Sequence, residues 1–150
     1  MKKGSWRKQF EWFVKSFKKR KPESYVGIKN LAATCYINSL LQQLFLIKQF
    51  STPLLSLDTK SIDDPENIAY EVQKIFAHLK SSDNDVYTTE SLCRTFILDG
   101  QPIDPRIQTD VDEFFHSLMD KLERNFIKIG KKDIIDDIFR GEYSNLIIGQ

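Results

Sequence analysis

The sequence has little of several residue types, and each scarcity excludes a class of protein. The two cysteines, Cys35 and Cys93, provide neither a disulfide framework nor a zinc-binding spacing. No apolar run approaches the ~18 residues of a membrane-spanning helix, and no basic start followed by an apolar stretch marks a secretory signal. We therefore expect an intracellular protein in a reducing compartment, cytoplasmic or nuclear.

The remaining composition is that of one globular domain or part of one. Hydrophobic residues make up 41% and charged residues 29% of the 150 residues, which excludes wholesale disorder. The net charge of +1 conceals an asymmetry. Residues 1–21 hold nine Lys or Arg and one acid, whereas residues 22–150 hold thirteen basic and twenty acidic residues. We therefore expect the two parts to have different roles.

Residues 1–24 form a basic, aromatic N-terminal extension. Its aromatic residues recur at helical spacing among lysines: Trp6, Phe10, Phe13 and Phe17. One interpretation is an amphipathic helix through which residues 1–21 contact an anionic membrane surface or a partner. The other is a helix whose aromatic face packs on the domain behind it. No nucleic-acid-binding motif accompanies the charge, so we expect no nucleic-acid partner.

Cys35 lies where a tight loop becomes an apolar helix. The stripe that predicts this helix comprises Ile37, Leu40, Leu41, Leu44 and Phe45. Thr34 is a candidate N-cap, so Cys35 falls in the first turn, where unpaired N–H groups and the helix dipole favour the nucleophilic thiolate. Asn30 can place an amide donor beside the same sulfur, where it would stabilise an oxyanion. The alternative is a buried structural cysteine.

Helices account for most of the pattern that follows. We expect the cysteine helix to run to Phe50, where Ser51, Thr52 and Pro53 end it, followed by a loop over residues 54–63. Acidic residues and a proline at 63–65 then start a helix through Lys80. Its apolar stripe comprises Ile68, Val72, Ile75, Phe76 and Leu79. His78 lies beside this stripe, and we interpret it as a surface residue.

Two more helices are predicted further along. A short helix capped at Thr88 or Thr89 has an apolar face of Leu92, Phe96 and Ile97. Cys93 lies on or near that face, and we interpret it as a packing residue. Asp110, followed three residues later by Glu113, has the spacing of a capping box and starts a long helix. The apolar stripe of that helix comprises Val111, Phe114, Phe115, Leu118 and Leu122.

The stretch from Gly27 to Leu44 resembles the cysteine box of the ubiquitin-specific proteases, a papain-like family of deubiquitinases. The matching positions are Gly27, Asn30, Leu31, Thr34, Cys35, Tyr36, Asn38, Ser39, Leu41 and Gln42. Residues 108–115 are similar to the Gln-Gln-Asp box of the same family, which flanks the channel for the ubiquitin tail. Ala32 is a departure, because the family usually has glycine there, a residue favoured where φ is positive.

The resemblance implies an α+β, papain-like cysteine protease fold. Residues 25–150 would be an incomplete N-terminal part of that catalytic domain, mainly the helical thumb and the start of the fingers sheet. That sheet would begin with a strand at 146–148. In many members a Cys-x-x-Cys zinc half-site follows this strand, which here would lie beyond Gln150. We therefore assign no metal ligand within the chain, and the resemblance implies no cofactor.

The activity implied by the resemblance is hydrolysis of the peptide or isopeptide bond after the C-terminal glycine of ubiquitin. Cys35 would attack the carbonyl, and Asn30 would hold the oxyanion. Asp110 and, after it, Glu113 would bind the arginine-rich tail of ubiquitin by charge and bidentate contacts. Ubiquitin and ubiquitinated proteins are the implied partners.

The general base of this reaction is missing from the sequence pattern. Neither His78 nor His116 matches the family's histidine, which lies far downstream. We therefore expect the isolated chain to be inactive or nearly so. The alternative function is a catalytically inactive ubiquitin-binding module or scaffold of the same fold.

Overall fold

The computed structural model describes residues 24–141. In chain order its elements are β1 (Gly27–Ile28), α2 (Cys35–Leu46), α3 (Lys48–Ser56), the 3₁₀ turn η1 (Thr59–Ser61), α4 (Ile68–Ser81), β2 (Val86–Tyr87), α5 (Glu90–Thr95), β3 (Ile97–Leu98), β4 (Gln101–Pro102), α6 (Val111–Lys128) and α7 (Asp133–Phe139). Among these residues, no helix has the length and hydropathy needed to cross a membrane. The predicted N-terminal helix and the strand at 146–148 lie outside the described residues.

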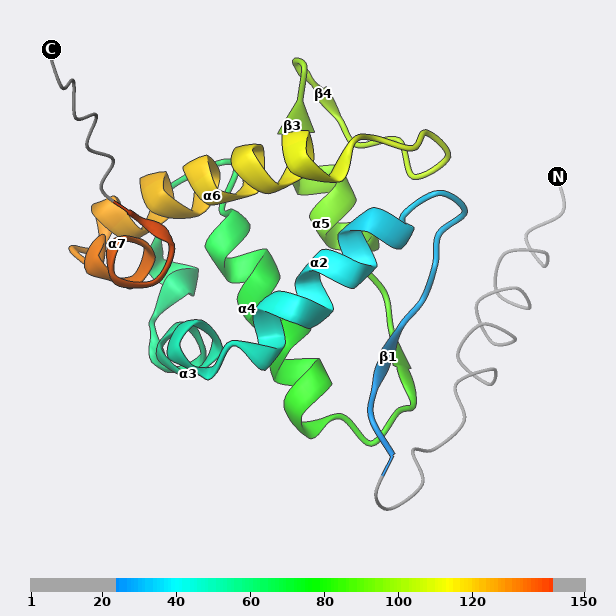
Figure 1. Ribbon diagram of the computed structural model, residues 1–150, viewed down its shortest axis with the longest axis horizontal. Coiled ribbons are helices and arrows are strands. Elements are labelled where there is room, and N and C mark those ends of the chain that lie inside the picture. The colour runs from blue at the N-terminus through cyan, green and yellow to red at the C-terminus, as the bar shows by residue number, and fades with distance from the viewer. Residues whose placement is uncertain (1–23, 142–150) are drawn as a thin grey trace, which may run out of the picture.

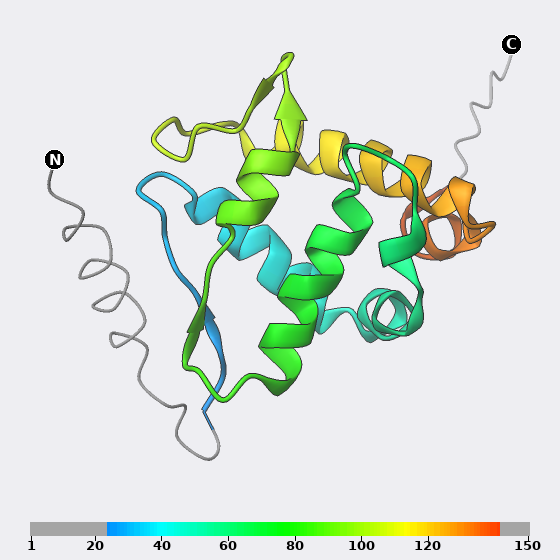
Figure 2. The same ribbon diagram turned by 180° about the vertical axis from the view of Figure 1, so that it is seen from behind.

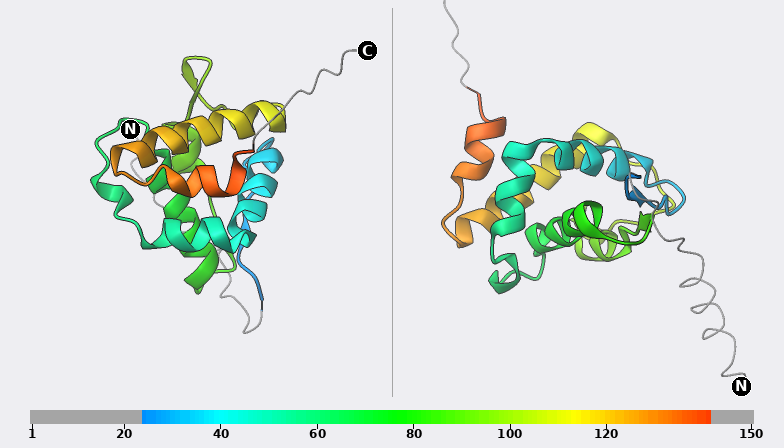
Figure 3. Two further views of the ribbon diagram at one scale, coloured as in Figure 1. Left: turned by 60° about the vertical axis from the view of Figure 1, so that its left-hand side comes forward. Right: turned by 90° about the horizontal axis from the view of Figure 1, so that it is seen from below.

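The helix α4 lies at the centre of the fold. It packs against α3, α5 and α6, and α2 in turn packs against α3 and α6 (Figures 1 and 2). At one end of the molecule α7 contacts both α3 and α6 (Figure 3). The largest side chains enclosed by these helices are phenylalanines: Phe50, Phe76, Phe96, Phe114 and Phe126. The described part is mostly helical with short strands, which is compatible with the expected α+β class.

The predicted stripe of α4 is confirmed, but the predicted start is wrong. The whole stripe is buried: Ile68, Val72, Ile75, Phe76 and Leu79. The helix begins at Ile68 because the side chain of Asn67 accepts a hydrogen bond from the Tyr70 N–H, 3.0 Å away. Asp64 instead accepts from the Glu66 N–H (2.9 Å) and closes a turn before the helix.

The helix that begins at Cys35 ends at Leu46 rather than at Phe50. Ile47 has extended backbone, and its carbonyl accepts the Phe50 N–H at 3.0 Å, so the chain bends and α3 begins. Pro53 lies inside α3, where its missing N–H leaves one helical bond unmade. Burial of Phe50 and its neighbours offsets that loss. The predicted helix end and the loop predicted over residues 54–63 are therefore wrong in part, since α3 and η1 occupy some of that range.

The apolar stripe of α6 begins later than predicted. Phe114, Leu118 and Leu122 are fully buried, but Val111 is 48% exposed. Val111 is the first residue of the helix, at its free end, and it does not join the core. Phe115 is half-buried and packs against the core from its edge.

Two pairs of short strands complete the described fold. β1 and β2 pair in parallel, with Gly27 opposite Val86, and lie side by side along one margin (Figure 2). β3 and β4 form an antiparallel hairpin around Asp99 and Gly100, both of which have positive φ. Ile97 belongs to this hairpin, so its predicted place in the preceding helix is wrong. The β1–β2 pair joins segments distant in the sequence, and the β3–β4 pair depends on a tight turn. Strands of two residues are too short to leave a periodic pattern, so periodicity did not predict them.

Candidate active site

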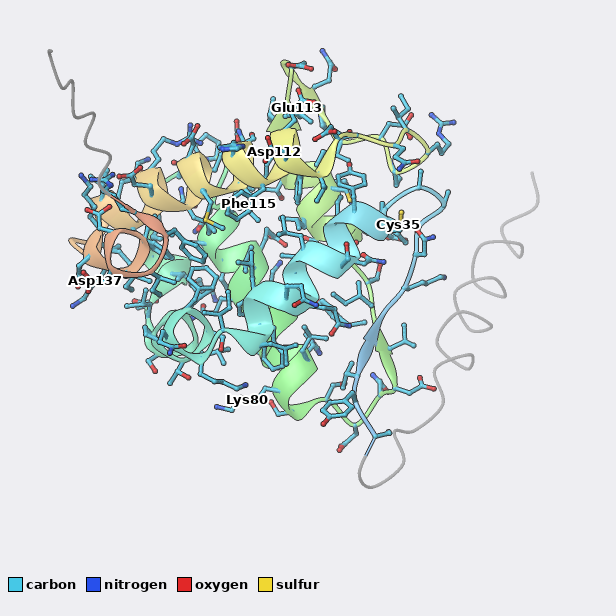
Figure 4. The ribbon with its side chains drawn as sticks, viewed as in Figure 1. Cys35, Lys80, Asp112, Glu113, Phe115 and Asp137 are labelled. Carbon is cyan, nitrogen blue, oxygen red and sulfur yellow. The ribbon has the colours of Figure 1, made fainter. Side chains whose placement is uncertain are left out.

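Cys35 is the first residue of α2, and its side chain is exposed. Figure 4 shows it at the start of that helix, next to the loop that follows β1. Thr34 occupies the N-cap position, as predicted. The sulfur therefore lies at the end of the helix where unpaired N–H groups and the dipole favour a negative charge.

The Thr34 side chain does not cap the helix, however. Its hydroxyl accepts a hydrogen bond from the Leu31 N–H (2.9 Å) and donates one to Oδ1 of Asn30 (3.1 Å). Thr34 is completely buried. Its side chain therefore folds the loop of residues 29–34, the catalytic loop, into a closed turn just before Cys35.

Asn30 is held by the same turn. Its Oδ1 also accepts the Thr34 N–H, at 3.1 Å. With Oδ1 engaged twice, the amide nitrogen is the free end of the side chain, and within residues 24–141 it has no hydrogen-bond partner. The structure records no contact between Asn30 and the Cys35 sulfur. It holds the Asn30 side chain against Thr34, the residue before Cys35.

A second asparagine, Asn38, anchors the other end of the catalytic loop. Its amide nitrogen donates to the carbonyls of Lys29 (3.2 Å) and Ile28 (3.4 Å). Our sequence reasoning assigned Asn38 no role. The signal was its position three residues after Cys35, which places the two side chains on one face of the helix.

The backbone at Ala32 has φ of 105°. Residues other than glycine rarely adopt this backbone conformation. The departure noted in the sequence therefore falls on a position that takes the conformation glycine favours. An alanine held in this conformation bears backbone strain.

Asp110 is the N-cap of α6, as predicted. Its Oδ1 accepts the N–H groups of Asp112 (2.8 Å) and Glu113 (3.3 Å). The reciprocal bond of a capping box, from Glu113 back to the cap residue, is absent from the described residues. Asp110 and Glu113 are both exposed, and Figure 4 shows Asp112 and Glu113 in the first turn of α6.

The two predicted parts of the site lie on neighbouring helix ends. The Ala33 N–H donates to the Pro105 carbonyl at 2.8 Å, which joins the catalytic loop to the segment before α6. The rings of Tyr36 and Phe114 meet edge to face with centroids 5.4 Å apart. The N-terminal ends of α2 and α6 consequently lie on the same side of the molecule (Figures 1 and 3).

Neither histidine is placed as a partner for Cys35. His78 stacks on Tyr87, with ring centroids 3.9 Å apart, and burial and then the charge of Lys74 lower the pKa of its imidazole. Nδ1 of His116 lies 2.8 Å from the carbonyl of Asp112, one turn earlier on α6. The described residues therefore hold no histidine in contact with the Cys35 thiol.

Cys93 is a packing residue, as predicted. It is 3% exposed in α5, within the main core. Burial raises the pKa of its thiol, which opposes formation of the reactive thiolate. The described residues hold no group of His, Cys, Asp or Glu arranged to bind a metal ion.

The sequence matches the family model described as ubiquitin carboxyl-terminal hydrolase over residues 26–149. It is 33% identical over 126 residues to ubiquitin carboxyl-terminal hydrolase 24 of Mus musculus, covering 84% of this chain and 5% of that protein. Two Schizosaccharomyces pombe proteins are also similar. Ubiquitin carboxyl-terminal hydrolase 15 is 34% identical over 88% of this chain and 11% of its own length. Ubiquitin carboxyl-terminal hydrolase 5 is 37% identical over 82% of this chain and 11% of its own length. The chain thus spans only a small part of these relatives.

Proposed function

The chain belongs to the ubiquitin-specific protease family, whose model matches residues 26–149, and we propose that it carries the nucleophilic half of a cysteine deubiquitinase. The observation that carries the proposal is the exposed Cys35 at the start of α2. The Ala33–Pro105 hydrogen bond joins the loop before Cys35 to the segment that leads into α6. In this reading the described helices are the thumb of the papain-like catalytic domain, and the fingers sheet begins after α7.

The reaction is acyl transfer to the Cys35 thiolate. The sulfur attacks the carbonyl carbon of the C-terminal glycine of ubiquitin, and the C–N bond to the substrate amine breaks as the amine takes a proton. Water then hydrolyses the thioester and restores the thiol. A histidine from a segment beyond the described residues accepts and returns the proton, and an Asp or Asn orients it.

Asn30 supplies the oxyanion donor. Two hydrogen bonds from Thr34 hold its Oδ1 (3.1 Å each), so the amide N–H groups are free to meet charge that develops on the carbonyl oxygen. Preorganisation of this kind avoids reorganisation during the reaction. The bonds from Asn38 to the carbonyls of Lys29 and Ile28 hold the same loop at its other end.

Asp110 and Glu113 bind the basic tail of ubiquitin. Oδ1 of Asp110 is engaged in the helix cap, whereas no hydrogen bond within residues 24–141 engages Oδ2. That oxygen and the exposed carboxylate of Glu113 can each take an arginine of the tail. The positive end of α6 carries only about half an elementary charge, so it does not cancel the attraction between these carboxylates and an arginine.

A first experiment tests the nucleophile. The full-length protein is incubated with ubiquitin that carries an electrophile at its C-terminus. Wild type and Cys93→Ala are expected to form a covalent adduct, and Cys35→Ala to form none. Binding of ubiquitin without any adduct in wild type would contradict the enzyme reading and favour the inactive ubiquitin-binding module.

A second experiment tests the tail site. Asparagine caps helices as well as aspartate does, so Asp110→Asn removes the charge and keeps the fold. We expect KM for a ubiquitin substrate to rise by about tenfold or more, the effect of losing one charge-assisted hydrogen bond. Glu113→Gln should act in the same direction. Asp112→Asn, on the same turn, is the matched control and should leave KM near the wild-type value.

The isolated chain of residues 1–150 is expected to lack turnover, because the base and its orienting residue are not among its matched motifs. Incubation of this chain with di-ubiquitin is the direct assay. Multiple turnovers at a rate on the order of 1 per second, which is within the range of ordinary enzymes, would contradict this expectation.

A further inference from the structure

Tyr36 follows Cys35 directly and is buried, with 5% of its surface exposed. Its hydroxyl group has no hydrogen-bond partner within the described residues. A buried hydroxyl without a partner destabilises the fold rather than holding a side chain in place. The position of Tyr36 must therefore be set by contacts of its ring.

The ring contact of Tyr36 lies one turn after Asp110. The Tyr36 ring meets Phe114 edge to face, with an interplanar angle of 85°. Phe114 is fully buried, and its N–H donates to the Asp110 carbonyl at 3.0 Å. Burial raises the pKa of the Tyr36 hydroxyl, and the side chain of Thr109, the residue before the cap, acts in the opposite direction. The ring thus lies against α6 at the turn that follows the cap.

Phe114 is held from a second side as well. It packs against Phe96, the residue that follows α5, with ring centroids 5.0 Å apart. The second connection between the catalytic loop and the α6 segment, from Ala33 to Pro105, is a single backbone hydrogen bond. It fixes one point of the loop, whereas the Tyr36 ring contacts α6 itself, at the turn that follows Asp110.

We propose that Tyr36 is a positioning residue that sets the spacing between the Cys35 sulfur and the tail-binding turn at Asp110. This inference rests on the proposed function. A tail held at Asp110 must present its last carbonyl at the sulfur, and a misplacement of about 1 Å can cost about 100-fold in rate. The ring of Tyr36, rather than its hydroxyl, performs this role.

The test compares two reagents on the full-length protein. The rate at which iodoacetamide modifies Cys35 depends on the thiol but not on a docked ubiquitin tail. The rate at which ubiquitin with a C-terminal electrophile modifies Cys35 depends on both. In Tyr36→Leu the edge contact with Phe114 is lost. We expect labelling by the ubiquitin electrophile to slow by at least about tenfold, while the rate with iodoacetamide stays near wild type.

Two controls separate positioning from general loss of structure. Phe50→Leu makes the same kind of change at another edge-to-face contact, that with Phe76 and Phe139, on α3 and away from the site. It should lower the melting temperature and leave both labelling rates unchanged. Tyr36→Phe keeps the ring and removes the unpaired hydroxyl, so it should label like wild type and melt no lower.

Each outcome decides the matter. If the ubiquitin electrophile labels Tyr36→Leu at the wild-type rate, the inference is overturned but the proposed function is not. The same holds if Phe50→Leu loses as much of its labelling rate as Tyr36→Leu does. A wild-type protein that forms no ubiquitin adduct overturns the proposed function and this inference with it. If Tyr36→Leu does not fold, Phe114→Leu removes the same contact from α6 and carries the same expectation.

Discussion

Replacement of Ala32 by glycine should make the protein more stable. Ala32 has φ of 105°, and its side chain is exposed, so loss of Cβ removes little packing. Strain at such a position costs about 1–3 kcal/mol, while the added freedom of glycine in the unfolded chain costs about 0.4–1 kcal/mol. We therefore expect Ala32→Gly to raise the free energy of unfolding by about 0.5–2 kcal/mol.

Ala33→Gly is the matched control. Ala33 is the next residue and does not have positive φ. The same substitution there relieves no strain and should lower the free energy of unfolding by about 0.4–1 kcal/mol. Urea denaturation followed by circular dichroism measures both variants, and a gain of 1 kcal/mol corresponds to about 2–4 °C in melting temperature for a protein of this size.

Equal destabilisation by the two substitutions would refute the strain argument. It would mean that alanine at position 32 is relaxed and that its departure from the family pattern has no energetic consequence. A gain in stability with Ala32→Gly and a loss with Ala33→Gly would support it, since position 32 already has the conformation that glycine favours.

Three further results are expected, one from labelling and two from substitutions. Iodoacetamide should modify Cys35 but not Cys93 in the folded protein, as measured by mass spectrometry, because Cys93 is buried and burial raises the pKa of its thiol. Cys93 should react only after denaturation. Thr34→Val should cost about 1–3 kcal/mol, since it leaves the catalytic-loop N–H and one bond of Asn30 unmade; it should also lower kcat, whereas Thr34→Ser restores both. Asp64→Asn should cost about 1.5–3 kcal/mol at neutral pH and flatten the acid limb of a stability-versus-pH curve.

The sign of the Asp64 effect follows from its neighbours. Burial raises the pKa of its carboxyl group, but the hydrogen bond from Lys128, the Glu66 N–H and the charge of Arg124 together lower it below the ordinary value. The Lys128 and Arg124 nitrogens lie 3.0 and 3.5 Å from Oδ2. The carboxylate therefore stabilises the fold above the unfolded-state pKa of about 4, and this stability is lost as pH falls through the lower, folded-state value.

Helix periodicity predicted much of the fold. The stripes of α4 and α6 are recognisable because apolar residues repeat every three or four positions, and most of those residues are buried. The ends of the helices were harder to predict. Asn67 rather than the Asp-Asp-Pro segment caps α4, because its amide also donates to the carbonyls of Thr59 and Ile62, contacts that no local pattern reveals.

The site was predictable in its parts but not in its supports. The sequence predicted Cys35 at a helix start and Asp110 at a helix cap, because helix starts and caps are set by residues close together in the chain. The helix bounds confirm both positions. The roles of Asn38 and Tyr36 were missed because they act through the partners they contact. Whether Asn30, Asp110 and Glu113 act on ubiquitin stays a prediction until the variants are measured.

The sequence by itself determined the family, the place of Cys35 at a helix start and most of the apolar faces of the helices, since caps, turns and periodicity arise from residues close together in the chain. Only the tertiary structure decided which surfaces meet. The bond of Ala33 to Pro105, the Tyr36–Phe114 contact and the link between Asn125 and Asp64, 61 residues apart, join distant segments. Such contacts depend on how helices pack in space, where each competes with many alternative pairings, and so no short stretch of sequence specifies them.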